Sequence, residues 1–196
     1  YKPRVDKELL KEFHEGIIAL SGCPAGEFIR NLQKGDSKDG EEIAKKYLEI
    51  FGEGNFYLEL NDLADNQGQF EVNSALVQLG KELQIPLVVT RDSHYINHDD
   101  AEAQDVMTCI GAGTHMDEPN RTSMANVDYS WSAPEEIIKR FKHLPDAISN
   151  TVKIAEECNL KLELNKWFFP PIDIPAGQTA GEYLRAEVYR RLPELT

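Results

Sequence analysis

Asp92 and His94 stand two residues apart, directly after the apolar stretch at residues 85–89. Four apolar residues, bounded by Pro86 and a polar cluster, predict a short buried strand. Successive side chains of an extended backbone point to opposite sides, so Asp92 and His94 point the same way. A carboxylate and an imidazole are both good ligands for Zn, Mn or Fe. The spacing therefore predicts part of a divalent-metal site at the end of this strand.

Each candidate residue also has a purely structural interpretation. Asp92 could make an Asx-type turn, and His94 could pack as a half-buried polar residue. Cys23 follows a second apolar stretch, residues 17–20, at a Gly-Cys-Pro turn. A thiolate there could be a soft metal ligand or a nucleophile, whereas a free cysteine is more commonly a small buried hydrophobe. Spacing alone leaves these alternatives open.

Glu59 lies within a third predicted strand, at residues 56–60, between Leu58 and Leu60. Its side chain therefore faces away from theirs, either to solvent or into a polar barrel interior, and solvent is favoured from the sequence. The chain contains no glycine-rich phosphate loop, no Gly-x-Ser-x-Gly and no His-Glu-x-x-His. The common nucleotide-binding and hydrolase motifs are absent.

The elements that position these residues alternate along the chain. The predicted order is strand, helix, strand, helix, strand, with strands at 17–20, 56–60 and 85–90 and helices at 39–51 and 72–83. This order is typical of parallel βα units. A further helix is predicted from Pro145. The predicted helix caps are Asp6 and the capping boxes Asp39 with Glu42, Asp99 with Glu102, Ser132 with Glu135 and Thr179 with Glu182. A strand is predicted at 127–131, and a proline-broken extended segment at 167–175 is typical of a domain junction.

Composition excludes some classes of function. The chain has 34 acidic and 21 basic residues and a net charge of -13, which repels a phosphate backbone. No apolar run approaches the roughly 18 residues that a membrane span needs. Cys23, Cys109 and Cys158 show no Cys-x-x-Cys spacing, which favours a reduced, cytoplasmic setting, and the last two are predicted in the core. We also expect the chain to be an internal part of a longer protein.

Several stretches together resemble one protein family. Residues 1–6, 18–23, 55–60, 85–95, 99–106 and 150–159 occur in the same order in the alpha subunits of bacterial DNA polymerase III. The resemblance implies an α/β fold, a partial distorted (β/α)7 barrel made of the last βα units of a polymerase-and-histidinol-phosphatase (PHP) domain, followed by a helical extension. It implies that residues 1–164 are the C-terminal part of the PHP domain with that extension. Residues 165–196 would be a linker and the start of the palm domain.

The resemblance also implies a metal site. In members of the family that retain it, the PHP site is a cluster of His, Asp, Glu and Cys ligands, and Cys23, Asp92 and His94 match three of those positions. The implied cofactor is a divalent metal, Zn, Mn or Mg, with the remaining ligands upstream of Tyr1. The family usually carries Asn where this chain has Arg91, which brings a positive charge beside the site.

For the intact protein, the resemblance implies DNA-templated DNA synthesis in bacterial chromosome replication. The polymerase reaction would use Mg and palm aspartates beyond Thr196, with DNA and the other subunits of the replicative holoenzyme as partners. The PHP region would be a phosphoesterase or proofreading nuclease. The alternative is a catalytically inert scaffold that stabilises the polymerase or docks a proofreading subunit. The fragment alone is expected to be inactive and to bind DNA weakly, because its own net charge is negative.

Overall fold

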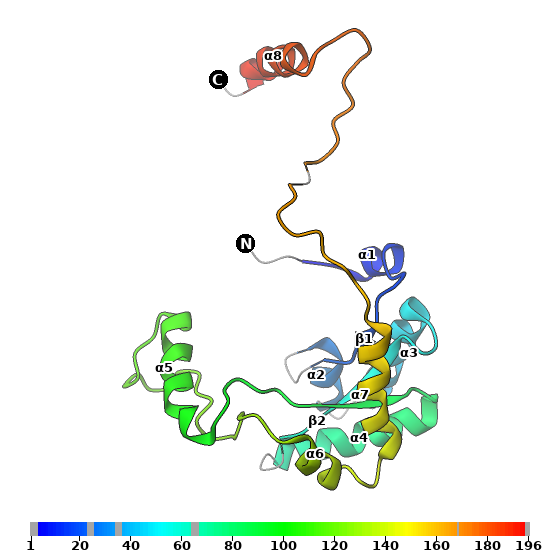
Figure 1. Cartoon of the computed structure of the whole chain (residues 1–196), viewed down its shortest axis with the longest axis vertical. Coiled ribbons are helices and arrows are strands. Elements are labelled where there is room, and N and C mark those ends of the chain that lie inside the picture. Colours follow the sequence, from blue (N-terminus) through cyan, green and yellow to red (C-terminus); the bar gives the residue numbers. More distant parts are fainter. Residues whose placement is uncertain (1–3, 23–25, 34–36, 64–66, 168, 195–196) are drawn as a thin grey trace. The chain divides into compact units, whose positions relative to one another are not determined.

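The computed structural model describes residues 4–22, 26–33, 37–63, 67–167 and 169–194. The chain divides into two compact units, unit 1 at Tyr1–Cys158 and unit 2 at Asn159–Thr196 (Figure 1). Unit 1 contains the sheet and the candidate residues. In unit 2, the described residues form one α-helix, α8 (Ala180–Arg191), and a 3-10 turn at Leu192–Glu194.

A small parallel sheet forms the centre of unit 1. Its strands are β1 (Ala19–Leu20), β2 (Phe56–Asn61) and β3 (Leu87–Thr90), in the order β1-β2-β3. Both pairings are parallel, and Leu58 lies opposite Leu87. The predicted mixed α/β class with parallel strands is confirmed. β1 is shorter than the predicted strand at residues 17–20, because only its last two residues pair with β2.

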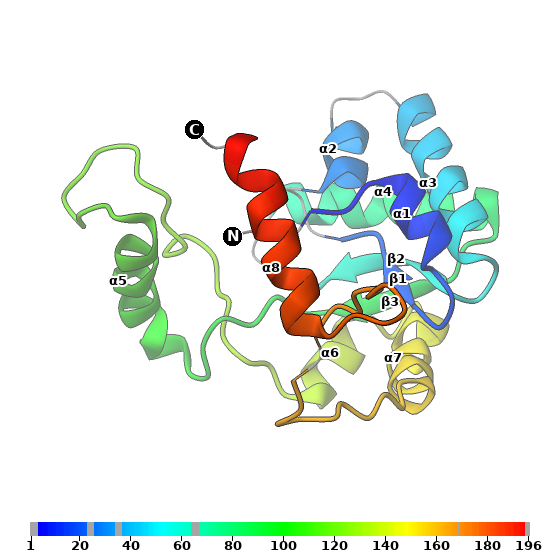
Figure 2. The same cartoon turned by 90° about the horizontal axis from the view of Figure 1, so that it is seen from above.

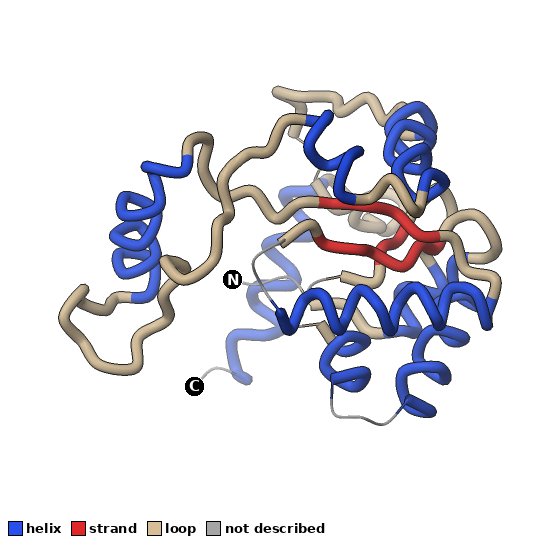
Figure 3. The backbone as a smooth tube through the Cα atoms, turned by 90° about the horizontal axis from the view of Figure 1, so that it is seen from below, coloured by secondary structure: helices blue, strands red, loops and turns tan. Residues whose placement is uncertain are grey.

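Helices lie on both sides of the sheet. In Figures 2 and 3, α2, α3 and α4 lie on one side of the strands, and α6 and α7 lie on the other. α5 projects away from this body. The helices of unit 1 are α1 (Lys7–Glu12), α2 (Glu27–Gln33), α3 (Ser37–Phe51), α4 (Gln67–Leu83), α5 (Ala101–Ala112), α6 (Pro134–Arg140) and α7 (Pro145–Glu157).

The core of unit 1 is built on the apolar residues of β2. Leu58 and Leu60 are fully buried and belong to one apolar cluster with Phe28 of α2 and Leu76 of α4. Each such side chain contributes roughly 1.5–3 kcal/mol of transfer free energy. Burial on this scale fixes the position of β2, and through its pairing the position of the C-terminal end of β3.

Two of the predicted helix caps are present. The carboxylate of Asp6 accepts a hydrogen bond from the backbone N–H of Leu9 at 2.9 Å and begins α1. Thr179 and Glu182 form the predicted capping box of α8, in which each side chain bonds the other residue's backbone N–H. These side chains satisfy backbone donors that the first turn of a helix leaves unpaired.

Three other predicted caps are wrong. Asp39 lies inside the first turn of α3, because that helix already begins at Ser37. A 3-10 turn at His98–Asp100 precedes α5, and Asp100, not Asp99, accepts the Asn97 backbone N–H. α6 begins at Pro134, whose fixed φ suits a first helical turn, so Ala133 takes the position predicted for Ser132.

The predicted strand at residues 127–131 is reduced to one parallel bridge between Tyr95 and Ser130. The polypeptide between these two residues carries α5 and the loop that follows it. Asp105 of α5 binds Arg121 of that loop through two hydrogen bonds, at 2.8 and 2.6 Å. The loop therefore packs back on its own helix.

Exposure corrects one prediction about the cysteines. Cys109 is buried, as predicted, but Cys158 is exposed, because α7 ends at Glu157 and Cys158 follows as its C-terminal cap. In unit 2, Trp167 is 88% exposed within a segment that has neither helix nor strand, as predicted for a proline-broken stretch. None of the helices in the described part of the chain is both long and apolar enough to cross a membrane.

Candidate metal centre

Asp92 and His94 meet at the C-terminal end of β3. Nε2 of His94 lies 3.0 Å from Oδ1 of Asp92, and both side chains are partly exposed, at 35% and 47%. β3 ends at Thr90, and the backbone then turns at Asp92, because the Ser93 N–H donates to the Arg91 carbonyl at 3.0 Å. The side chains of Asp92 and His94 meet across this turn, and not through continued strand alternation. The structure therefore brings these two candidates together at the end of a buried strand.

A neighbouring segment supports the histidine. The backbone N–H of His94 donates to the carbonyl of Tyr129 at 2.9 Å, and the two aromatic rings meet edge to face with centroids 5.4 Å apart. Burial, together with the negative charge of Asp92, raises the pKa of the Tyr129 hydroxyl. Tyr129 thus packs beside both members of the pair and restricts the imidazole.

The donor chemistry of the pair fits a divalent cation. Two ligands that each lie about 2.0–2.1 Å from a tetrahedral zinc are about 3.3 Å apart, close to the observed separation of Asp92 and His94. A closed site needs more than two protein ligands. Among the residues that the structure describes, no group of three or more His, Cys, Asp or Glu side chains gathers in one place. Cys23, the third candidate, lies outside the described residues.

Glu59 lies on the face of the sheet that carries Thr90, and its side chain does not point freely into solvent. It is only partly exposed, its carboxylate accepts a hydrogen bond from Thr90 Oγ1 at 2.7 Å, and its backbone N–H donates to Ser21 Oγ at 2.9 Å. The interpretation of Glu59 as a solvated side chain is therefore wrong. This hydrogen bond between strands holds the Glu59 carboxylate beside Thr90, which precedes Asp92 by two residues.

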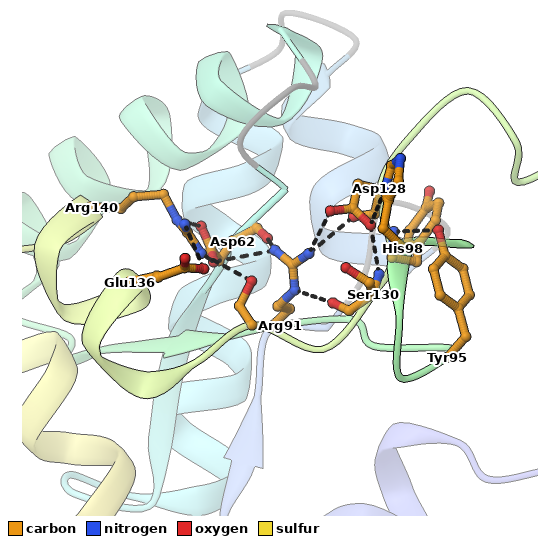
Figure 4. A network of polar contacts seen from close by, with 10 residues as sticks. Asp62, Arg91, Tyr95, His98, Asp128, Ser130, Glu136 and Arg140 are labelled. Carbon is orange, nitrogen blue, oxygen red and sulfur yellow. Dashed lines mark hydrogen bonds and ion pairs between the residues drawn. The ribbon is translucent and has the colours of Figure 1, made fainter. Parts of the chain in front are cut away.

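The Arg91 side chain belongs to a polar network. It is 8% exposed and lies between Asp62 and Asp128 (Figure 4). The expected positive charge next to Asp92 is thus paired with the carboxylates of Asp62 and Asp128. Asp62 is 2% exposed and also binds Arg140 of α6.

The pKa of Asp128 is lowered although burial acts against it. Burial alone would raise this pKa, but hydrogen bonds from Ser130, the contact with His98 and the charge of Arg91 together outweigh it. Asp128 is therefore an anion in this network.

Sequence reasoning did not single out Asp62, Asp128 or Arg140. These residues come from separate segments, and only the folded chain brings them together around Arg91. The one signal in the sequence is Arg91 itself, a charged residue that directly follows the end of a buried strand.

The chain is similar to parts of known bacterial DNA polymerases. Residues 1–63 match the PHP domain family, so Asp92 and His94 lie beyond the matched residues. Across 98% of its length the chain is 37% identical to DNA polymerase III subunit alpha of Treponema pallidum. It is 33% identical to the subunit of the same name from Pseudomonas aeruginosa over 97% of its length, and 35% identical to an error-prone DNA polymerase of Symbiobacterium thermophilum over 96%.

These matches cover only part of the relatives. The chain spans 16% of the length of the two alpha subunits and 17% of the error-prone polymerase. The order of the shared segments nevertheless extends through almost all of this chain. The chain is therefore similar to a segment of bacterial DNA polymerase III alpha subunits, and its first 63 residues match the PHP domain.

Proposed function

We propose that this chain supplies the C-terminal part of a PHP metal site within a DNA polymerase III alpha subunit. Asp92 and His94 would be ligands, and Cys23 would be a third. The carrying observation is the 3.0 Å contact between Asp92 and His94 at the C-terminal end of a parallel strand. In α/β folds this end of the strands is where ligands are held.

The three parallel strands are consistent with the last βα units of a (β/α)7 barrel, with residues 1–164 in the PHP region and its helical extension. Residues 165–196 would be the linker and the start of the palm. In that barrel, the face that carries Glu59, Thr90 and Asp92 would be the interior. The hydrogen bond between Glu59 and Thr90 supports this assignment, because it places a carboxylate on a partly buried face of the sheet.

The site would serve phosphoester or pyrophosphate hydrolysis. A divalent cation, Zn, Mn or Mg, would supply an activated water and stabilise the charge that develops on phosphorus. In this chain, Asp92 and His94 would hold their donor atoms on one side of the strand. Tyr129 would orient the imidazole and shield one side of it from water. None of these residues acts as an acid or base in this proposal.

For the intact protein we infer DNA-directed DNA synthesis in chromosome replication. The relatives are named DNA polymerase III subunit alpha, which supports the polymerase part of this inference. The polymerase centre, with its Mg and aspartates, would lie in the palm outside this chain. Its partners would be DNA and other holoenzyme subunits, in the cytoplasm. This chain would contribute little to DNA binding directly, because its net charge is -13.

One observation favours a second candidate, an inert PHP scaffold that stabilises the polymerase or docks a proofreading subunit. Among the described residues, Asp92 and His94 are not joined by a third ligand, whereas a buried ionic network fills the adjacent corner. A scaffold would need the ionic network for its stability, but it would not need metal ligands.

Metal analysis of the full-length protein, purified without chelator, separates the two candidates. We expect bound Zn, Mn or Fe, and a lower metal content in the double variant Asp92→Ala, His94→Ala. His115 and Asp117 provide a matched control, since they have the same residue types and spacing on an exposed turn. Their double alanine variant should keep the metal. A full-length protein without metal would sink the proposal and leave the scaffold.

A further inference from the structure

The Arg91 side chain makes several hydrogen bonds in unit 1, and the proposed metal site does not use it. Its Nε donates to the carbonyl of Ser130 at 2.6 Å, and Nη1 donates to the carbonyl of Asp62 at 2.9 Å. Nη2 donates to the carbonyl of Asp128 at 3.3 Å, and the two carboxylates lie 3.4 Å from the guanidinium. The planar guanidinium group thus contacts three backbone carbonyls and two carboxylates. The ammonium group of a Lys, a single positive centre, could not make all of these contacts.

Two of those carbonyls belong to residues 128–131, which we call the strap. The strap is also tied to the continuation of β3: Tyr129 accepts from the His94 N–H at 2.9 Å, and the Trp131 N–H donates to the Tyr95 carbonyl at 3.0 Å. Tyr95 Oη accepts from the Tyr129 N–H at 3.0 Å. Carbonyls 128 and 130 face Arg91, while Tyr129 and Trp131 face the strand. The strap is therefore fixed from two directions.

We propose that Arg91 is a positioning residue for the Asp92–His94 pair, an internal cation that holds the strap in place without any bound metal. Arg91 acts on the pair through Tyr129, because Tyr129 is part of the strap and its carbonyl and ring contact His94. This proposal rests on the proposed function, because it concerns the geometry of the same pair.

The energetics favour such a role. Hydrogen bonds that involve a charged group contribute about 1.5–3 kcal/mol, and a buried carbonyl left without a donor costs about 1–3 kcal/mol. Loss of Arg91 would strand the carbonyls of Ser130 and Asp62, while Asp62 would still be bound by Arg140. Loss of Arg91 should therefore destabilise the strap more than it destabilises the sheet.

Amide hydrogen exchange in the full chain, with a chelator present, tests the proposal. In Arg91→Gln, the His94 and Trp131 amides should exchange about ten- to a hundredfold faster, as expected when a charged hydrogen bond is lost. The Leu58 amide, which donates to Pro86 within the sheet, reports the fold and should remain protected. Arg91→Lys, which keeps the charge but not the planar guanidinium group, should lie between the two. Arg190→Gln removes a guanidinium from an exposed pair in unit 2 and should change neither strap amide.

Chemical rescue distinguishes a guanidinium site from general loss of packing. In Arg91→Ala, millimolar guanidinium should restore protection of His94 and Trp131, whereas equal urea should not. Asp128→Asn provides a milder variant if removal of Arg91 unfolds the chain, because Asp128 is on the strap and partly exposed. Unchanged strap protection in Arg91→Gln and Asp128→Asn would overturn the proposal. So would loss of Leu58 protection together with the strap, without guanidinium rescue.

A zinc titration of the full-length protein and its Arg91→Gln variant, followed by the amount of zinc bound, separates this proposal from the proposed function. Weaker zinc binding in Arg91→Gln than in the unsubstituted chain supports both. Equal zinc binding with a loosened strap would overturn the positioning role alone. If no protein binds zinc while the strap still depends on Arg91, the metal site fails, and Arg91 still positions the contact between His94 and Tyr129.

Discussion

Arg140 Nε donates to Oδ1 of Asp62 at 2.8 Å, and Arg140 Nη2 pairs with Oδ2, across 78 residues of sequence. This two-pronged pair joins α6 to the end of β2. Asp62 is almost completely buried, whereas Arg140 keeps about a third of its exposure. The carboxylate is therefore the member of the pair whose removal costs more, since Arg140 and Arg91 both lose their contact with the most buried acid of the network, and Asp128 and Glu136 are more exposed.

We expect Asp62→Ala to lower the free energy of unfolding by about 3 kcal/mol, because removal of one partner from a buried ionic pair leaves an uncompensated charge. Urea unfolding of the full chain measures this. Glu187→Ala breaks an exposed pair with Arg190 and should change the same quantity by less than about 1 kcal/mol. Equal effects of the two substitutions would show that the Asp62 network does not support unit 1.

Gly80 gives a test of how α4 packs on the sheet. A Cβ at Gly80 would lie 2.9 Å from Cδ2 of Leu87 and 3.1 Å from the carbonyl oxygen of Ile85. Gly80→Ala should therefore lower the free energy of unfolding by about 1–2 kcal/mol through overpacking. Gly111→Ala, where a Cβ meets nothing within 4 Å, should raise it by about 0.5–1 kcal/mol through helix propensity. The same sign for both would contradict the close approach at Gly80.

Acid should loosen the loop that packs on α5. Hydrogen bonds from Arg121 and then Ser123 lower the pKa of Asp105 to about 2 from a usual 3.8. A lowered pKa means that the ionised form stabilises the folded loop above pH 3.8, and that this contribution is lost as the pH falls from about 4 to about 2. Carboxyl carbon NMR should place the midpoint of Asp105 near 2. Arg121→Gln should return it toward its usual value, and a midpoint near 4 in the unsubstituted chain would contradict the pairing.

The capping box of α8 predicts a local effect. Thr179→Ala removes the acceptor for the Glu182 N–H and should cost about 1 kcal/mol of helix stability. Because α8 is a helix of 12 residues, the loss should appear as faster exchange of the Glu182 and Tyr183 amides. Thr151→Ala, a mid-helix change in α7, should leave those two amides unchanged. Equal protection of Glu182 in all three proteins would show that the box contributes nothing.

Local patterns predicted the elements well where periodicity and burial agree. Alternation and apolar runs located β2 and β3, and the apolar stripe of α4 and the proline at the start of α7 located two helices. Local patterns failed at helix starts with several cap-type residues in succession, as at Ser37 and Asp39. There the choice depends on which backbone N–H groups are exposed once the segment packs.

The site was predictable only in part, for a related reason. The closeness of Asp92 and His94 was predicted from their spacing of two residues, although a turn at Asp92 and not a continued strand brings them together. The network of Arg91 joins residues that are 29, 37 and 39 positions away, and no local rule selects them. Glu59 was misassigned for the same reason, since the hydrogen bond that holds it comes from Thr90 on another strand.

The parallel bridge between Tyr95 and Ser130 joins the two ends of the segment that carries α5. The ends of this segment are therefore held together whatever its length. Closing a longer loop costs only slightly more entropy, since the cost grows with the logarithm of length. Evolution could therefore lengthen, shorten or exchange residues 98–126 while the strand end, the strap and the Asp92–His94 pair keep their places.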